Sequence, residues 1–187
     1  MRLTNEMTAQ LVLQSSAESS SGALFSPCRA YRYRLWRDWG DPNRRCVFVG
    51  VNPSTADETK DDPTIRKCVG FAKRWGFGAI DMVNLFAWRS TDQLGLFRTQ
   101  DPVGDENHCR ILQAFDRASR IVFAWGSGKT AAVRKLITSR IRNDAQMLYG
   151  YRSDVERGCL GETEDGFARH PLMLPYATPF EPLERKA

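Results

Sequence analysis

Three short apolar segments, each followed by a turn, constrain the fold of this chain more than any other feature. They span residues 45–51, 79–85 and 121–125. Their length and apolar character are typical of strands that are buried on both faces of a sheet. Longer amphipathic stretches follow them, at residues 62–76, 103–118 and 130–141. The spacing of apolar residues in these stretches predicts helices.

The alternation of strands and helices predicts an α/β protein. Units of this kind form parallel strands joined by right-handed crossovers. We therefore predict a three-layer α/β/α sandwich with a mostly parallel central sheet, to which residues 30–39 and 145–149 would add strands. The first helix has a defined start, since Asp62 is a good N-cap and Pro63 suits the first helical position.

The N-terminal residues differ in composition from the remainder. The run S-S-A-E-S-S-S-G ends at Gly22 and cannot form a packed element. We predict a flexible leader over residues 1–22 and a single α/β domain over residues 23–187.

The overall composition excludes several classes of protein. The chain has 187 residues, of which 42% are hydrophobic and 26% are charged, as in ordinary globular proteins. No apolar run approaches the roughly 20 residues of a membrane span, and no secretory signal is evident. The five cysteines are odd in number and never form a C-x-x-C pair, which favours free thiols in the cytoplasm. The sequence does not indicate an oligomeric state.

Positive charge is concentrated near one predicted strand. The net charge is +5, and arginines interleave with aromatic residues at Arg29, Tyr31, Arg32, Tyr33, Arg34, Trp36, Arg37 and Trp39. Such a mixture suits phosphates and stacked bases, which would make Arg29, Arg32, Arg34 and Arg37 nucleic-acid contacts. The alternative is an amphipathic strand with its arginines toward water and its aromatic residues toward the core.

Polar residues follow each of the three core strands. The candidates for substrate binding are Gly50, Pro53, Ser54, Asn84, Phe86, Trp88, Arg89, Trp125 and Ser127. Ligands of α/β proteins bind beyond the carboxyl ends of the strands, so we expect one shared site. Asn52 could orient a water or contact a base edge, or it could be a turn asparagine that bonds its own backbone. Trp88 could stack on a base or simply pack its loop.

Titratable residues near these strand ends are candidates for catalysis. Asp57, Asp61 and Asp62 could act as general bases or cation ligands, although helix capping accounts for Asp62. His170 could stabilise a developing anion, or it could be a loop residue before proline. His108 lies within a predicted helix and suits a structural role.

Several familiar sites are absent from the sequence. The G-S-G-K segment at residues 126–129 lacks the first glycine and the spacing of a P-loop. There is no G-x-G-x-x-G, no G-x-S-x-G elbow and no zinc-ligand spacing. We therefore predict no metal and no cofactor.

Seven motifs occur in an order that resembles a known family. They are Y-R-Y, N-P-S-T-A-D, D-D-P-T-I-R, N-L-F-A, P-V-G, W-G, and C-L-G with H-P-L. Together they resemble an uncharacterised bacterial and phage family, domain of unknown function number 1643, over about residues 28–174. That family implies no activity.

A more distant resemblance does imply one. The order F-V-G-V-N-P-S, N-L-F, V-F-A-W-G-S and H-P-L is similar to the uracil-DNA glycosylase superfamily, whose fold is the same three-layer sandwich. This resemblance implies that Asn52 positions a water and that Asn84 contacts the base edge. It also implies that Phe86 or Trp88 stacks on the base and that His170 stabilises the leaving anion. Leu172 stands where that superfamily has a phosphate-binding serine, and no basic wedge follows.

Three functions follow from these patterns. The first is a nucleobase-directed hydrolase that cleaves an N-glycosidic bond, using a water held by Asn52 with help from Asp57 and His170. The second is a non-catalytic protein on the same fold that binds a nucleic acid or nucleotide through residues 29–39 and the pocket. The third is a hydrolase or transferase of small metabolites, with or without a divalent metal on Asp57 and Asp61.

Overall fold

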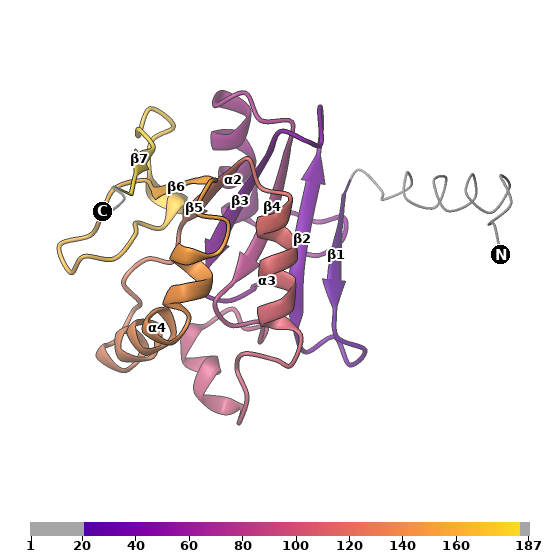
Figure 1. The fold of residues 1–187 in the computed structure, drawn as a ribbon. Coiled ribbons are helices and arrows are strands. Elements are labelled where there is room, and N and C mark those ends of the chain that lie inside the picture. The colour runs from indigo at the N-terminus through magenta and orange to yellow at the C-terminus, as the bar shows by residue number, and fades with distance from the viewer. Residues whose placement is uncertain (1–20, 184–187) are drawn as a thin grey trace, which may run out of the picture.

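A mixed sheet forms the centre of the molecule (Figure 1). The computed structural model describes residues 21–183, which form a seven-stranded sheet of order β1-β2-β4-β3-β5-β6-β7. The strands are β1 (Ser21–Phe25), β2 (Arg32–Asp38), β3 (Arg45–Gly50), β4 (Ala79–Asn84), β5 (Arg120–Phe123), β6 (Glu156–Cys159) and β7 (Glu181–Pro182). Ser21 and Gly22 of the predicted leader belong to β1, and the rest of that leader lies outside the described residues.

The prediction of a mostly parallel sheet is wrong. The central strands β4, β3, β5 and β6 are parallel, whereas β1, β2 and β7 pair with their neighbours in antiparallel fashion. The connections explain the directions of β1 and β2. Residues 26–31 and 39–44 are short loops, and a parallel crossover needs a dozen or more residues.

Helices pack against both faces of the sheet. Side chains of β3 alternate, with Val47 and Val49 on one face and Cys46 and Phe48 on the other. The helices are α2 (Pro63–Arg74), α3 (Asn107–Asp116) and α4 (Ala131–Asn143). Apolar residues of α2 pack on the Phe48 face, whereas α3 and α4 pack on the Val47 face, as the ribbon shows (Figure 1).

The start of α2 agrees with the sequence. The Asp62 carboxylate accepts a hydrogen bond from the Ile65 N–H at 2.9 Å, and Pro63 is the first helical residue. This cap fixes the position of Asp62 at the end of the loop that follows β3. The helix therefore begins next to the carboxyl edge of the sheet.

The predicted strand at residues 145–149 is wrong. This segment follows the C-cap of α4 at Asp144 and forms a π-helical turn at Gln146–Gly150, and the Leu148 N–H donates to the Asp144 carbonyl. The fourth parallel strand is instead β6, whose sequence E-R-G-C has no apolar run to reveal it.

The arginines of β2 do not face water, contrary to the alternation model. Arg34 makes a bidentate ion pair with Asp81 at 2.8 and 3.0 Å, and Arg45 donates to the same carboxylate at 2.8 Å. Arg34, Arg45 and Asp81 are all buried. The reason is that β2 lies between β1 and β4, so neighbouring strands cover it and supply the opposite charge.

Neither a disulfide nor a membrane-spanning helix occurs within residues 21–183. All five cysteines are free thiols. No helix within residues 21–183 is long and apolar enough to span a bilayer.

Candidate functional site

A cavity of about 250 Å³ opens at the carboxyl edge of the parallel strands. Each of the three core strands contributes to it, through Gly50 at the end of β3 and Asn52 beyond it, Asn84 at the end of β4, and Trp125 after β5. His170 comes from the segment after β6. The structure thus brings together residues that are far apart in the sequence, because parallel strands end at the same edge of a sheet.

Asn84 and Arg32 form the most buried polar part of the cavity. The Asn84 Oδ1 accepts a hydrogen bond from the Arg32 Nη2 at 3.4 Å. The two residues are only 1% and 2% exposed, respectively. Within residues 21–183, neither the Asn84 Nδ2 nor the Arg32 Nε has a hydrogen-bond partner. Buried donors without partners are costly, so this arrangement favours a ligand that offers acceptors.

Gly50 allows Asn84 to occupy this position. A Cβ atom at Gly50 would lie 2.8 Å from the Asn84 Nδ2 and 2.7 Å from the Met82 Cε. Any larger residue would therefore displace the amide that lines the cavity.

Asn52 is held by its amide nitrogen. The Nδ2 donates to the Ser90 carbonyl at 2.8 Å and to the Pro53 carbonyl at 3.2 Å. The bond to Pro53 is the local backbone contact of a turn asparagine, whereas the bond to Ser90 fixes the side chain against another loop. The Oδ1 remains as the acceptor of this amide, as the orientation of a water would require.

His170 lies at the rim of the cavity. Its Nδ1 accepts the Leu172 N–H at 3.3 Å, so in the neutral ring the proton is on Nε2. Although the residue is exposed, the surrounding protein desolvates the ring and lowers its pKa, and the negative charge of Asp62 opposes this shift. The neutral ring thus has an N–H donor at Nε2.

Asp62 is the carboxylate that lines the cavity, and capping does not account for it fully. The cap uses Oδ1, and the carboxylate has a second oxygen. Its charge acts on both Arg32 and His170. Burial lowers the pKa of Arg32 to about 10, so this side chain remains a cation at neutral pH.

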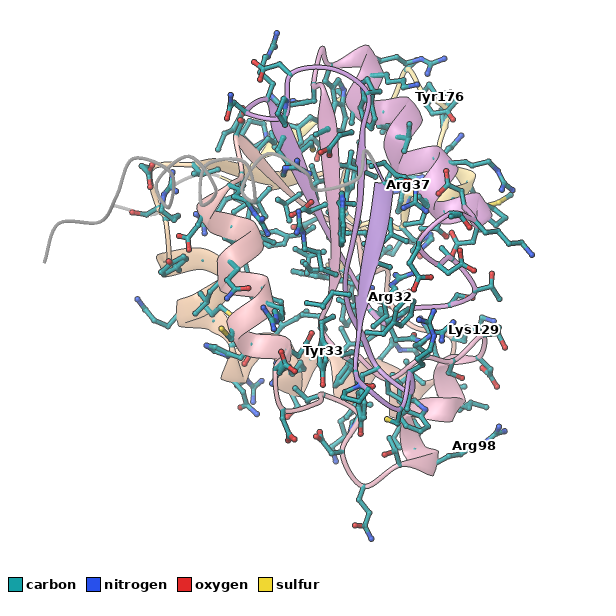
Figure 2. The ribbon with its side chains drawn as sticks, turned by 90° about the vertical axis from the view of Figure 1, so that its right-hand side faces the viewer. Arg32, Tyr33, Arg37, Arg98, Lys129 and Tyr176 are labelled. Carbon is teal, nitrogen blue, oxygen red and sulfur yellow. The ribbon has the colours of Figure 1, made fainter. Side chains whose placement is uncertain are left out.

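Further residues at the cavity were not identified from the sequence. They include Thr64, Met82, Ser90, Thr91, Gln93 and Lys129. Figure 2 labels two of the cations, Arg32 on β2 and Lys129 on the loop before α4. Among the described lining residues, these two cations outnumber the single carboxylate of Asp62. In the sequence, the G-S-G-K segment was the signal that could have identified Lys129, although this segment is not a P-loop.

Several predicted residues lie elsewhere. The Asp57 Oδ1 accepts N–H groups from Thr59 and Lys60, which lowers the pKa of Asp57. Asp57 does not line the cavity, and a carboxylate with a lowered pKa is a weak base. Phe86 is 2% exposed within the apolar core, so it offers no stacking surface. Pro53 and Ser127 do not line the cavity either.

The four arginines that were predicted to contact nucleic acid lie in different surroundings. Arg34 is buried against Asp81, and Arg37 makes an ion pair with Asp61 at 2.8 Å, so neither side chain faces outward. Arg32 lines the cavity. Arg29 is exposed and, with Trp88 and Arg89, lines a neighbouring hollow that also includes Ser54.

Two other candidate sites, a second cavity and a metal site, have less support in the structure. A second cavity, of about 400 Å³, is bounded by Trp125, Tyr149 and Phe167. No buried polar side chain that lacks a partner, among those described, lines it. Residues 21–183 contain no group of three metal-ligating side chains, and Asp61 is paired with Arg37, so the metal version of the third function has no ligand set.

Comparison with known proteins gives a family but no activity. A family model described as "Protein of unknown function (DUF1643)" matches residues 32–172. The chain, with its mixed α/β sheet and a cavity at the strand ends, therefore belongs to that family. No curated protein and no solved structure matches it.

Proposed function

We propose that the cavity binds a nucleobase and that the protein hydrolyses the N-glycosidic bond of that base in a nucleic acid or nucleoside. The observation that supports this most is the pair of buried donors without partners, the Asn84 Nδ2 and the Arg32 Nε. A nucleobase presents carbonyl oxygens and ring nitrogens as acceptors. A cavity of about 250 Å³ is below the roughly 300–1,000 Å³ of drug-sized sites, which suits a single base.

The resemblance to uracil-DNA glycosylases supports the same proposal. In the order of motifs of that superfamily, Asn52 corresponds to the water-positioning residue, Asn84 to the base-contacting asparagine and His170 to the terminal histidine. All three residues line the cavity. The helices on both sheet faces agree with the proposed glycosylase-like sandwich. Extrusion of a base from a duplex costs a few kcal/mol, which contacts in the cavity would offset.

The proposed reaction assigns one role to each residue. The Asn52 Oδ1 holds a water whose oxygen attacks C1′ of the sugar, and the C1′–N bond breaks with its electron pair passing to the base. Asp62, in place of Asp57, stabilises positive charge on the sugar and accepts the proton of the water. The His170 Nε2–H donates a hydrogen bond to the departing base, and Asn84 binds a base acceptor.

The test is release of free base. Purified protein is incubated with damaged, deaminated and modified bases in single- and double-stranded DNA, in RNA and as nucleosides, and base release is followed by mass spectrometry. We expect release by the wild type and loss of turnover in Asn52→Ala, with activity normalised to the folded fraction because Asn52 also bonds Ser90.

Aspartate variants provide the matched control. Asp57→Asn preserves the Oδ1 acceptor of its turn and lies outside the cavity, so it should retain activity. Asp62→Asn preserves a capping side chain and should lose activity. A fully active Asn52→Ala protein would overturn the proposal.

A second candidate is a nucleotide-binding protein without catalysis. The excess of cations at the cavity, Arg32 and Lys129 against Asp62, favours it. Ligand affinity would then be strong in the wild type and would fall with salt, while no base would be released from any substrate.

A further inference from the structure

An open hollow of about 440 Å³ adjoins the cavity. Its described lining comprises Arg29, Ser54, Thr55, Trp88, Arg89 and Thr91, together with Ala30 and Ser90. Ser54, Ser90 and Thr91 also line the cavity, so the two spaces share a wall. A ligand in the cavity could therefore extend into the hollow.

Two arginines converge at this hollow. The guanidinium groups of Arg29 and Arg89 lie 4.0 and 4.7 Å from the centroid of the Phe25 ring. The Arg89 Nη1 donates to the Arg29 carbonyl at 3.1 Å, which ties the two loops together. The Arg89 Nε is buried and has no hydrogen-bond partner within the described part of the chain.

Negative charge near the hollow offsets only part of the positive charge of its two arginines. Glu58 makes a bidentate ion pair with Arg29, at 2.8 and 3.1 Å, and its side chain is 42% exposed. An exposed pair of this kind contributes little to stability and can be exchanged for another anion. Hydroxyl groups of Ser54, Thr55 and Thr91 add further donors around the same space.

We propose that this hollow is a phosphate subsite, so that the ligand of the cavity is a nucleotide rather than a free nucleoside. The proposal rests on the proposed function, since it takes the cavity to hold the base. Arginine forks match phosphate oxygens in geometry and charge. The Arg89 Nε supplies a buried donor to the phosphate, and Arg29 exchanges Glu58 for it. The phosphate comes either from a mononucleotide or from a nucleic-acid strand.

The experiment measures binding of two phosphate-bearing probes by calorimetry. The first is an equimolar mixture of nucleoside monophosphates, with the matching nucleosides as reference, and the second is a mixed-sequence single-stranded 11-mer. We expect wild-type protein to bind the monophosphates at least about tenfold more tightly than the nucleosides, as charge-assisted hydrogen bonds imply. Tighter binding of the 11-mer, with an affinity that falls by about 0.7 log units per log unit of salt for each phosphate, would identify a strand as the source.

Variants with opposite effects make the test specific. Arg89→Gln should lose most of the preference for phosphate, whereas Glu58→Gln should strengthen phosphate binding because it releases Arg29. Arg98→Gln removes the same charge from an exposed side chain outside the hollow and should change nothing (Figure 2). Equal affinity of the wild type for nucleosides and monophosphates would overturn the proposal, as would unchanged phosphate binding in Arg89→Gln.

Failure of the phosphate proposal can be distinguished from failure of the proposed hydrolysis. If the phosphate proposal fails alone, base release from nucleosides continues and remains sensitive to Asn52→Ala. If the proposed hydrolysis fails alone, Arg89→Gln still weakens binding of the monophosphates, and no base is released.

Discussion

The direction of one hydrogen bond determines which atoms a ligand of the cavity must present. Arg32 can only donate, so the Asn84 amide must turn its oxygen toward Arg32 and its Nδ2 toward the remaining space. The amide orientation therefore follows from chemistry, and a base acceptor is the expected partner of Nδ2.

This orientation gives a prediction for Asn84→Asp. The new carboxylate would pair with the buried Arg32 cation, and the donor without a partner would be lost, so the melting temperature should be retained or raised. Nucleobase binding should be lost, because the carboxylate repels base acceptors. Calorimetric titration with thermal melting checks both effects, and the exposed Asn43→Asp serves as the control. Unchanged base affinity in Asn84→Asp would contradict the assignment of Asn84.

His170 gives a prediction about pH. Desolvation lowers the pKa of the folded-state ring below its ordinary value of 6.5, and the Asp62 charge partly restores it. Below pH 6.5 the unfolded chain therefore binds the proton more readily, and the free energy of unfolding should fall as the pH decreases. Asp62→Asn should lower the His170 pKa further and widen this loss.

NMR titration of the ring protons measures the pKa directly. The chain has two histidines, so His108→Gln assigns the signals. A His170 pKa that rises in Asp62→Asn would contradict the electrostatic coupling.

Residue patterns predicted only part of the cavity. Gly50, Asn52 and Asn84 were identifiable because each comes at the end of a core strand. The prediction that Phe86 offers a stacking surface failed because its side chain packs into the apolar core, which no local pattern reveals. Asp62 was named as a candidate base, but helix capping gave it a complete local explanation. Its place in the cavity with Arg32 and His170 depends on the fold and could not be predicted from the local sequence.

At the scale of elements, a buried charge network joins three strands. Asp81 of β4 pairs with Arg34 of β2 and Arg45 of β3, and Arg45 also contacts Asp38 at 3.0 Å. This network accounts for Arg34, one of the arginines that suggested nucleic-acid binding.

The network predicts a large effect of Asp81→Asn on stability. Removal of the carboxylate takes the Asp81 charge away from the two buried guanidinium groups of Arg34 and Arg45, although Arg45 keeps its contact with Asp38, and this should cost about 3 kcal/mol or more. Chemical denaturation measures the change. Asp154→Asn breaks the exposed pair with Arg152 and should have little effect. Equal stability of the two variants would contradict a structural role for Asp81.

The elements themselves were largely predictable from periodicity. The three core strands and three helices agree with the structure because their apolar patterns are strong and their ends have caps or glycines. The segment at residues 145–149 was not predictable because a short apolar run does not distinguish a strand from a helix turn. Strand β6 was missed because it has no apolar run. The prediction of a mostly parallel sheet was wrong because the direction in which strands pair depends on contacts between residues that are distant in the sequence.

At the scale of the whole molecule, the candidate site lies at the carboxyl edge of the parallel strands in the mixed sheet. The parallel order of β4, β3, β5 and β6 brings their carboxyl ends together, and the antiparallel hairpin of β1 and β2 carries Arg32 to the same place. The hairpin turn also supplies Arg29 to the hollow. The proposed base and phosphate subsites thus depend on both kinds of strand pairing.

The most direct test of nucleobase binding is a titration of isotope-labelled protein with free nucleobases, followed through the side-chain amide signals of its asparagines. We predict that at least one base shifts the Asn52 and Asn84 amide signals in a saturable manner and leaves Asn43 unchanged. Absence of such shifts for every base, or shifts confined to asparagines that do not line the cavity, would contradict the account.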